Sequence, residues 1–204
     1  FAYDLIYVGA ADSNGGQDIA TGTLGVLQNY MNAGNGFLVG HDALSNGMPN
    51  ITRAMQGLAN ITPAFDLDTK ANDPNFGPYT SRVTTTARVV KSGKITTFPF
   101  LISDKIPIKQ THNQYQFAKG DIWVQFADDA TGQLLDNELK EYKGEKGTSN
   151  FYLTTNGNVG MSQVGHTTGY ATTEEEKLLV NTMVSLAQKP TSQFTTTTGE
   201  PQAV

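Results

Sequence analysis

The stretches Tyr3–Gly9 (YDLIYVG) and Phe37–Gly40 (FLVG) decide the predicted fold. Both are short, mainly apolar runs with aromatic and β-branched residues, the pattern of a strand that is covered on both faces. Between them, Leu24, Leu27 and Met31 recur at helical spacing. Strand, helix and strand within about 40 residues form a βαβ unit, whose right-handed crossover makes the two strands parallel. We therefore predict adjacent, parallel strands, with Tyr3–Gly9 at the centre of the sheet.

Later stretches add further strands to this unit. Asp121–Ala127 (DIWVQFA) is predicted to be a strand, and the weak alternation of Val83–Val90 is compatible with a strand or a helix. An Asn156-Gly157 pair separates Phe151–Thr154 from Val159–Val164. Such a pair predicts a β-hairpin with a type I′ turn.

The remaining segments are predicted as helices and loops. A capping box beginning at Thr173 places three glutamates on a helix N-terminus, and the apolar face of that helix continues until Pro190. Ile51–Asn60 is compatible with a short helix, and Pro63–Tyr79 is predicted to be a loop. The predicted class is α/β: a flavodoxin-like, open, mostly parallel sheet with helices on both faces and a late β-hairpin.

The domain organisation follows from length and composition. A chain of 204 residues suits one domain better than two, because domains average about 150 residues. We expect residues 1–190 to form that domain and residues 191–204 to be a Thr-rich linker or tail. Both ends are typical of cuts in a longer chain, so neighbouring domains of the same chain are expected as partners.

Composition excludes several classes of function. The net charge is −5, with three arginines in the chain, so no basic stripe is available to bind nucleic acid. No apolar run approaches the roughly 20 residues of a membrane-spanning helix. The chain contains no cysteine, which removes disulfides, thiolate metal sites and cysteine nucleophiles. Together with a Thr/Asn/Gly-rich, weakly charged surface, this favours an extracytoplasmic protein, either secreted or on a bacterial cell surface.

Candidate binding residues follow the predicted strands, because ligands of such sheets bind outside the carboxyl ends of the strands. Asp12, His41, Asp42 and His166 come after predicted strands, and His112 and Tyr115 are further candidates in the polar and aromatic stretch at residues 111–115, for which no strand is predicted. Histidine is a common metal ligand and general base, so the three histidines are also candidate ligands of a divalent metal. The alternative stays open that each histidine only caps a strand end.

Three motifs resemble a known family. They are YDLIYVG, the stretch Gly34–Leu44 (GNGFLVGHDAL) and the stretch Asn158–Gly169 (NVGMSQVGHTTG). They resemble the class I glutamine amidotransferase-like fold, in particular its trehalose-utilisation-protein-like branch, and a related domain of large bacterial cell-surface proteins. In that domain the stretches TFPF and THNQY, at residues 97–100 and 111–115, are also expected. The resemblance implies a flavodoxin-like sheet with a pocket where His41 and His166 meet.

One departure from the family limits what the resemblance implies about activity. The family has its nucleophilic cysteine at the turn where this chain has His41-Asp42, so the chain is not expected to be a glutamine amidotransferase. We favour a non-catalytic cell-surface module that binds carbohydrate or another small ligand. The alternative is an enzyme that uses a metal or its histidines on a sugar-like substrate. Convergence of the three imidazoles would favour the alternative.

Overall fold

The computed structural model describes residues 2–9, 17–43, 48–55, 61–63, 83–112, 116–118, 120–135, 140–142, 145–147, 150–164, 166 and 171–188. The helical elements are η2 (Thr21–Thr23), α1 (Leu24–Asn32), α2 (Pro49–Met55), α3 (Lys94–Thr97) and α4 (Thr173–Ala187). The main sheet contains β1 (Leu5–Val8), β2 (Gly36–Val39), β4 (Val83–Val89), β5 (Lys105–His112), β7 (Asp121–Ala127), β10 (Phe151–Asn156) and β11 (Val159–Ser162). Two small sheets pair β3 (Ile61–Pro63) with β6 (Gln116–Ala118) and β8 (Lys140–Tyr142) with β9 (Glu145–Gly147).

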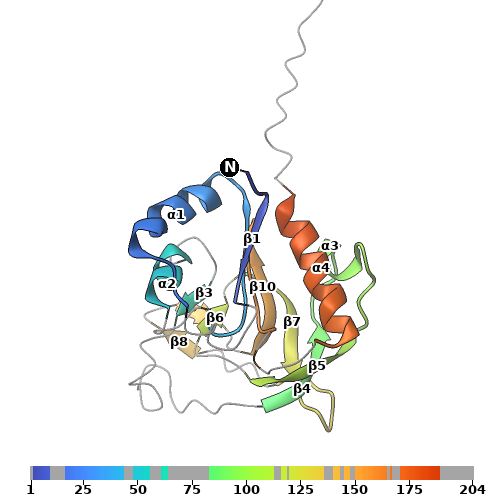
Figure 1. Ribbon diagram of the computed structural model, residues 1–204. Helices are drawn as coiled ribbons and strands as arrows, with labels where there is room; N and C mark the ends of the chain where they lie inside the picture. Colours follow the sequence, from blue (N-terminus) through green and yellow to red (C-terminus); the bar gives the residue numbers. More distant parts are fainter. Residues whose placement is uncertain are drawn as a thin grey trace, which may run out of the picture.

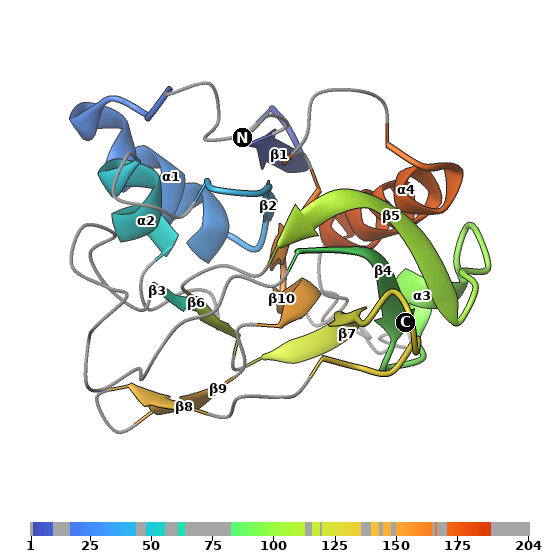
Figure 2. The ribbon, with the colours of Figure 1, turned by 90° about the horizontal axis from the view of Figure 1, so that it is seen from below.

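The main sheet has seven strands in the order β1-β2-β11-β10-β7-β4-β5. β1 is parallel to β2 and β2 is parallel to β11, whereas each later pair in this order is antiparallel. The sheet is strongly curled into a half-barrel, so that β5 arches back toward the β2 side (Figure 2). The prediction that the first two strands are adjacent and parallel is confirmed.

The predicted flavodoxin-like, mostly parallel sheet is wrong. The βαβ unit determined only its own two strands; the hairpin then makes β10 antiparallel to β11, and β7, β4 and β5 continue antiparallel. Burial agrees with this division, because β2 is buried throughout while β5 alternates between exposed and buried positions. Alternation is typical of antiparallel strands with one solvated face. β1 is also an edge strand rather than a central one.

Two apolar cores lie on opposite faces of the sheet. α1 and α2 lie on one side and α3 and α4 on the other (Figure 1). On the first side, α1 and α2 pack on β2 and β11 through Leu27, Tyr30, Met31, Phe37, Val39, Ile51, Met55 and Met161. On the second side, α3 and α4 pack on β4, β5, β7 and β10 through Ile95, Ala87, Ile106, Ile108, Val124, Phe126, Tyr152 and Leu178.

Helix α4 connects the two ends of the curled sheet, since it packs against both β2 and β5. Its N-cap is Thr172, one residue before the predicted position, and Glu175 completes the capping box. The buried Glu175 carboxylate also accepts hydrogen bonds from the Tyr152 hydroxyl at 2.7 Å and from the Lys109 backbone N–H at 3.1 Å. One side chain therefore ties the helix to β10 and β5, which stabilises the curl.

Several local predictions are refined by the structure. The predicted strand Asp121–Ala127 is present as β7, and Val83–Val90, which was compatible with a strand or a helix, forms strand β4. The stretch that was compatible with a short helix corresponds in part to α2. The hairpin is present, but its loop is Gly157-Asn158, because Asn156 pairs with Val159. Of these two, only Gly157 has a positive φ, which fits a type II′ turn and not the predicted type I′.

Two predicted segments fall outside the described residues: the loop after Pro63 and the tail 191–204. In the described ranges, no helix combines the length and the apolar character needed to cross a bilayer.

Candidate metal centre

The three histidines of the chain meet at one edge of the sheet. The pairing directions make β2, β11 and β5 run the same way, so their carboxyl ends share an edge. His41 and His166 follow the neighbouring strands β2 and β11, and His112 is the last residue of β5. β5 is at the far end of the strand order, so only the curl of the sheet brings His112 back to the other two (Figure 2).

The imidazoles of this group, which we call the histidine cluster (His41, His112 and His166), lie in mutual contact. The ring centroids are 4.5 Å apart for His41 and His166, 4.6 Å for His112 and His166, and 5.1 Å for His41 and His112. His41 is fully buried and the other two are half-buried. Each histidine offers one ring nitrogen such that the three nitrogens all lie within 4.8 Å of one another, so the cluster could hold a metal ion.

A close backbone contact fixes the position of His41. The Gly40 N–H donates to the carbonyl of Val8 at 2.8 Å, and the His41 N–H donates to that of Val164 at 3.2 Å. A Cβ on Gly40 would overlap the carbonyl oxygen of Gly9. Glycine is therefore required at position 40, because no side chain fits where the ends of β1 and β2 touch.

The turn after His41 holds Asp42 in an uncommon backbone conformation. Ala43 N–H donates to the Gly40 carbonyl at 3.2 Å, which closes a four-residue turn, and Asp42 has φ 59° at its third position. Glycine or asparagine is preferred there. The Asp42 Oδ1 lies 3.5 Å from His41 Nε2. The turn thus places a carboxylate beside the cluster at some cost in backbone strain.

A chain of hydrogen bonds orients two of the three rings. His41 Nδ1 lies 3.0 Å from Gln163 Oε1, and His41 Nε2 lies 2.9 Å from His166 Nδ1. An amide oxygen only accepts hydrogen bonds, so His41 Nδ1 carries a hydrogen. In the neutral ring, Nε2 is then an acceptor for the His166 Nδ1–H. The His41 Nε2 lone pair therefore points into the cluster, where it accepts the His166 hydrogen in the metal-free protein.

The donor set fits a transition metal. Zn–N bonds of about 2.0–2.1 Å at tetrahedral angles separate the ligand nitrogens by about 3.3 Å. The His41 Nε2–His166 Nδ1 pair, at 2.9 Å, needs to open by only a few tenths of an ångström, and the hydrogen that His166 Nδ1 donates in the metal-free protein would move to Nε2 of that ring on metal binding. Pairs up to 4.8 Å apart need to close by at most about 1.5 Å, which rotation of half-buried side chains can supply.

The predicted site residues divide into three groups. The structure brings His41, His112 and His166 together and places Asp42 beside them. Asp12 and Tyr115 lie outside the described residues. The sequence prediction missed Gln163, three residues before His166, because a single glutamine at a strand end gives no recognisable pattern.

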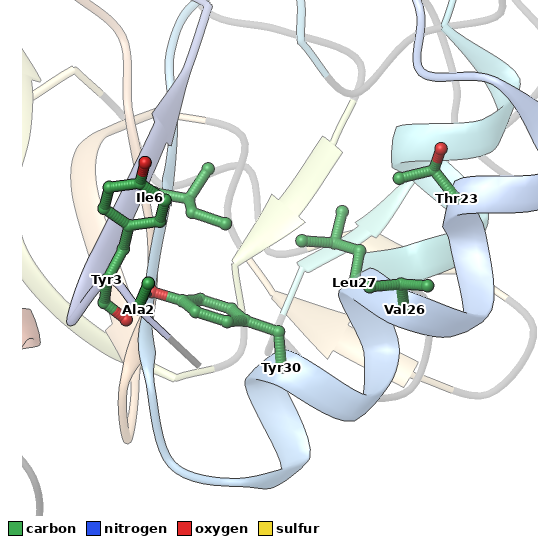
Figure 3. A pocket seen from close by; sticks show the side chains of 7 residues that line it. All are labelled: Ala2, Tyr3, Ile6, Thr23, Val26, Leu27 and Tyr30. Atoms are coloured by element: carbon green, nitrogen blue, oxygen red, sulfur yellow. Dashed lines mark hydrogen bonds between the residues drawn. The ribbon is translucent and has the colours of Figure 1, made fainter.

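A separate apolar cavity lies between β1 and α1 (Figure 3) and shares no lining residue with the histidine cluster. Its volume is about 280 Å³, and its lining is Ala2, Tyr3, Ile6, Thr23, Val26, Leu27 and Tyr30. The lining contains no histidine and no carboxylate.

No family model, no curated protein and no solved structure matches this chain. The resemblance to the amidotransferase-like family therefore stays a prediction, and the flavodoxin-like sheet that it implied is replaced by the half-barrel described above. Among the described residues, the histidine cluster is the feature that bears on function.

Proposed function

We propose that this chain binds one divalent transition-metal ion through His41, His112 and His166 and leaves a coordination position open for water or a substrate. The observation that carries the proposal is the convergence of the three imidazoles from three strands at one sheet edge. The His41–Gln163 contact adds the outer hydrogen bond that metal-binding histidines almost always make.

Zinc is the ion that suits this donor set best. Imidazole nitrogens favour Zn²⁺, Cu²⁺, Ni²⁺ and iron, whereas Ca²⁺ and Mg²⁺ prefer oxygen ligands. Structural zinc sites use four protein ligands, and three histidines with an open position are typical of catalytic zinc. Zinc at such a position supplies an activated water.

The cluster supports the metal-dependent hypothesis over the non-catalytic module, because the two hypotheses differ in whether the imidazoles converge. In the proposed enzyme, His41 and His166 hold the ion from the adjacent strands β2 and β11, and His112 closes the site from β5. Asp42, beside the cluster, is placed to accept a hydrogen bond from a polar group there. A sugar-like substrate and an extracytoplasmic location remain predictions from the sequence.

A competition titration tests this proposal. Zinc is titrated into metal-stripped protein in the presence of a chromophoric chelator, for the wild type and for His41→Ala, His112→Ala and His166→Ala. We expect one zinc ion to bind per wild-type chain. Each histidine variant should lose more than about 100-fold in zinc affinity, because loss of a residue that only hydrogen-bonds to a metal ligand already costs about 10- to 100-fold.

Gln110→Ala is the matched control, since Gln110 is an exposed residue on the same strand as His112. Its zinc affinity should equal that of the wild type. Wild-type zinc affinity no higher than that of a variant in which His41, His112 and His166 are all replaced by alanine would rule the proposal out.

A further inference from the structure

We propose that Gln163 is a positioning residue of this metal site: it holds His41 in the tautomer that presents the Nε2 lone pair to the ion. This inference rests on the proposed function. Gln163 follows β11 directly, and its Oε1 lies 3.0 Å from His41 Nδ1, on the side of the ring away from His166. Its side-chain hydrogen bond to the cluster is made to His41.

The backbone and surroundings of Gln163 hold its side chain in place. Gln163 is 1% exposed, and its N–H donates to the Tyr152 carbonyl at 2.8 Å. His41 is fully buried as well, so the contact between the two side chains is shielded from water. A shielded hydrogen bond is stronger than an exposed one, and it limits rotation of the His41 ring.

The contact determines which nitrogen of His41 is available to a metal. Gln163 Oε1 accepts, so Nδ1 must donate and Nε2 keeps its lone pair. Without this acceptor the ring could place its hydrogen on Nε2 instead. Nε2 would then be blocked at the nitrogen that faces His166 Nδ1 and Asp42 Oδ1.

The Oε1 atom makes the hydrogen bond that holds the Gln163 amide. In the described part of the chain, Gln163 Nε2 is buried without a hydrogen-bond partner. An unpaired buried donor is unfavourable, and native proteins contain few of them. The hydrogen bond to His41 is thus the polar contact that this side chain makes.

The unpaired Nε2 also makes a sharp pair of variants available. Gln163→Glu keeps the shape and the acceptor and loses no hydrogen bond, because Nε2 makes none. Gln163→Leu keeps the approximate volume and removes the acceptor. Gln125→Leu is the matched control, since Gln125 is also a buried glutamine with an unpaired amide atom, and it lies on β7, which carries no histidine of the cluster.

Two measurements test the inference. Nitrogen-15 NMR of the metal-free protein reports which nitrogen of His41 carries the hydrogen, and a zinc titration reports affinity. We expect His41 in the Nδ1–H form in the wild type, in Gln163→Glu and in Gln125→Leu. Gln163→Leu should bind zinc about 10- to 100-fold more weakly, and Gln163→Glu should bind at least as tightly as the wild type, because a carboxylate acceptor makes the histidine a stronger ligand.

The NMR result decides the inference independently of zinc. An Nε2–H tautomer of His41 in the wild type would overturn it, even if Gln163→Leu does not fold. Wild-type zinc affinity in a folded Gln163→Leu would also overturn it. If the wild type binds no zinc but His41 is in the Nδ1–H form only when an acceptor is at position 163, the proposed function fails and the orienting role of Gln163 stands.

Discussion

The parallel part of the sheet (β1, β2 and β11) and its antiparallel part (β10, β7, β4 and β5) contribute to the histidine cluster in different ways. β2 and β11 are buried throughout, and the glycine contact at the end of β2 fixes the backbone. This part supplies His41, His166 and Gln163. In the antiparallel part, β4 and β5 alternate between buried and exposed positions over part of their length, and β5 supplies only His112, at the far edge of the curl. Two of the candidate ligands, His41 and His166, are therefore preorganised by neighbouring strands, while the position of His112 depends on the curl of the sheet.

The largest expected effect comes from breaking the parallel part. Gly40→Ala places a Cβ on the Gly9 carbonyl, so the ends of β1 and β2 must separate. We expect a loss of at least about 3 kcal/mol in the free energy of unfolding, because backbone atoms cannot yield as a flexible side chain can. Urea denaturation monitored by circular dichroism measures it. Gly22→Ala, where a Cβ meets nothing within 4 Å, is the control and should change stability little.

Metal binding should join the two parts. A bound ion that contacts His112 as well as His41 and His166 stabilises the curled sheet, and zinc at 100 times its Kd should raise the free energy of unfolding by about 2.7 kcal/mol. His112→Ala should remove most of this gain. Thermal unfolding with and without zinc measures both. An equal zinc-induced rise in Tm for the wild type and His112→Ala would show that β5 takes no part in the site.

Alkaline pH should weaken the contact between β1 and its neighbours. Burial raises the pKa of Tyr7 to about 12. Burial, and then the Glu175 carboxylate, also raises the pKa of Tyr152 well above its usual value. The unfolded chain ionises tyrosine near pH 10 while the folded chain does not, so the unfolded state binds fewer protons and stability falls as pH rises above about 10.

The expected loss through Tyr7 is about 1 kcal/mol at pH 11. Denaturation at pH 9 and pH 11 measures it, and Tyr7→Phe should show a shallower decline than the wild type. Identical pH dependence in both proteins would mean that Tyr7 ionises as easily in the folded chain as in the unfolded one.

The smallest expected effect concerns the turn after β2. Asp42 has φ 59°, so Asp42→Gly relieves backbone strain, although glycine also makes the unfolded chain more flexible. We expect a net gain of about 0.5 kcal/mol in stability, measured by urea denaturation. Asp42→Asn keeps the preference for this conformation and should stay close to the wild type. A clear loss of stability in Asp42→Gly would show that the carboxylate stabilises the fold.

The sequence predicted the parallel part because the information there is local. Two apolar runs separated by a helix specify β1 and β2, and histidines directly after strands predict where His41 and His166 point. The antiparallel part depends on long-range pairing. β5 was not among the predicted strands, and its pairing with β4 joins segments that are well separated in the chain. The two-residue hairpin loop sets only the direction of β10 relative to β11.

The third ligand shows the same limit. His112 was a candidate by residue type, but its place next to His41 comes from β5 closing the curl, which α4 stabilises through Glu175. No local sequence pattern indicates that β5, at the far end of the strand order, lies close to the end of β2. Gln163 was missed for another reason: its role depends on one hydrogen bond to a residue 122 positions away.

X-ray absorption at the zinc edge of the zinc-loaded protein tests the central claim most directly, because it counts the ligands of the ion. We expect three imidazole nitrogens at about 2.0–2.1 Å and one oxygen ligand in the open position. His112→Ala should lower the count to two imidazoles. A wild-type spectrum with one imidazole or none would contradict zinc binding by the histidine cluster, since the ion would then lie outside the site formed by His41, His112 and His166.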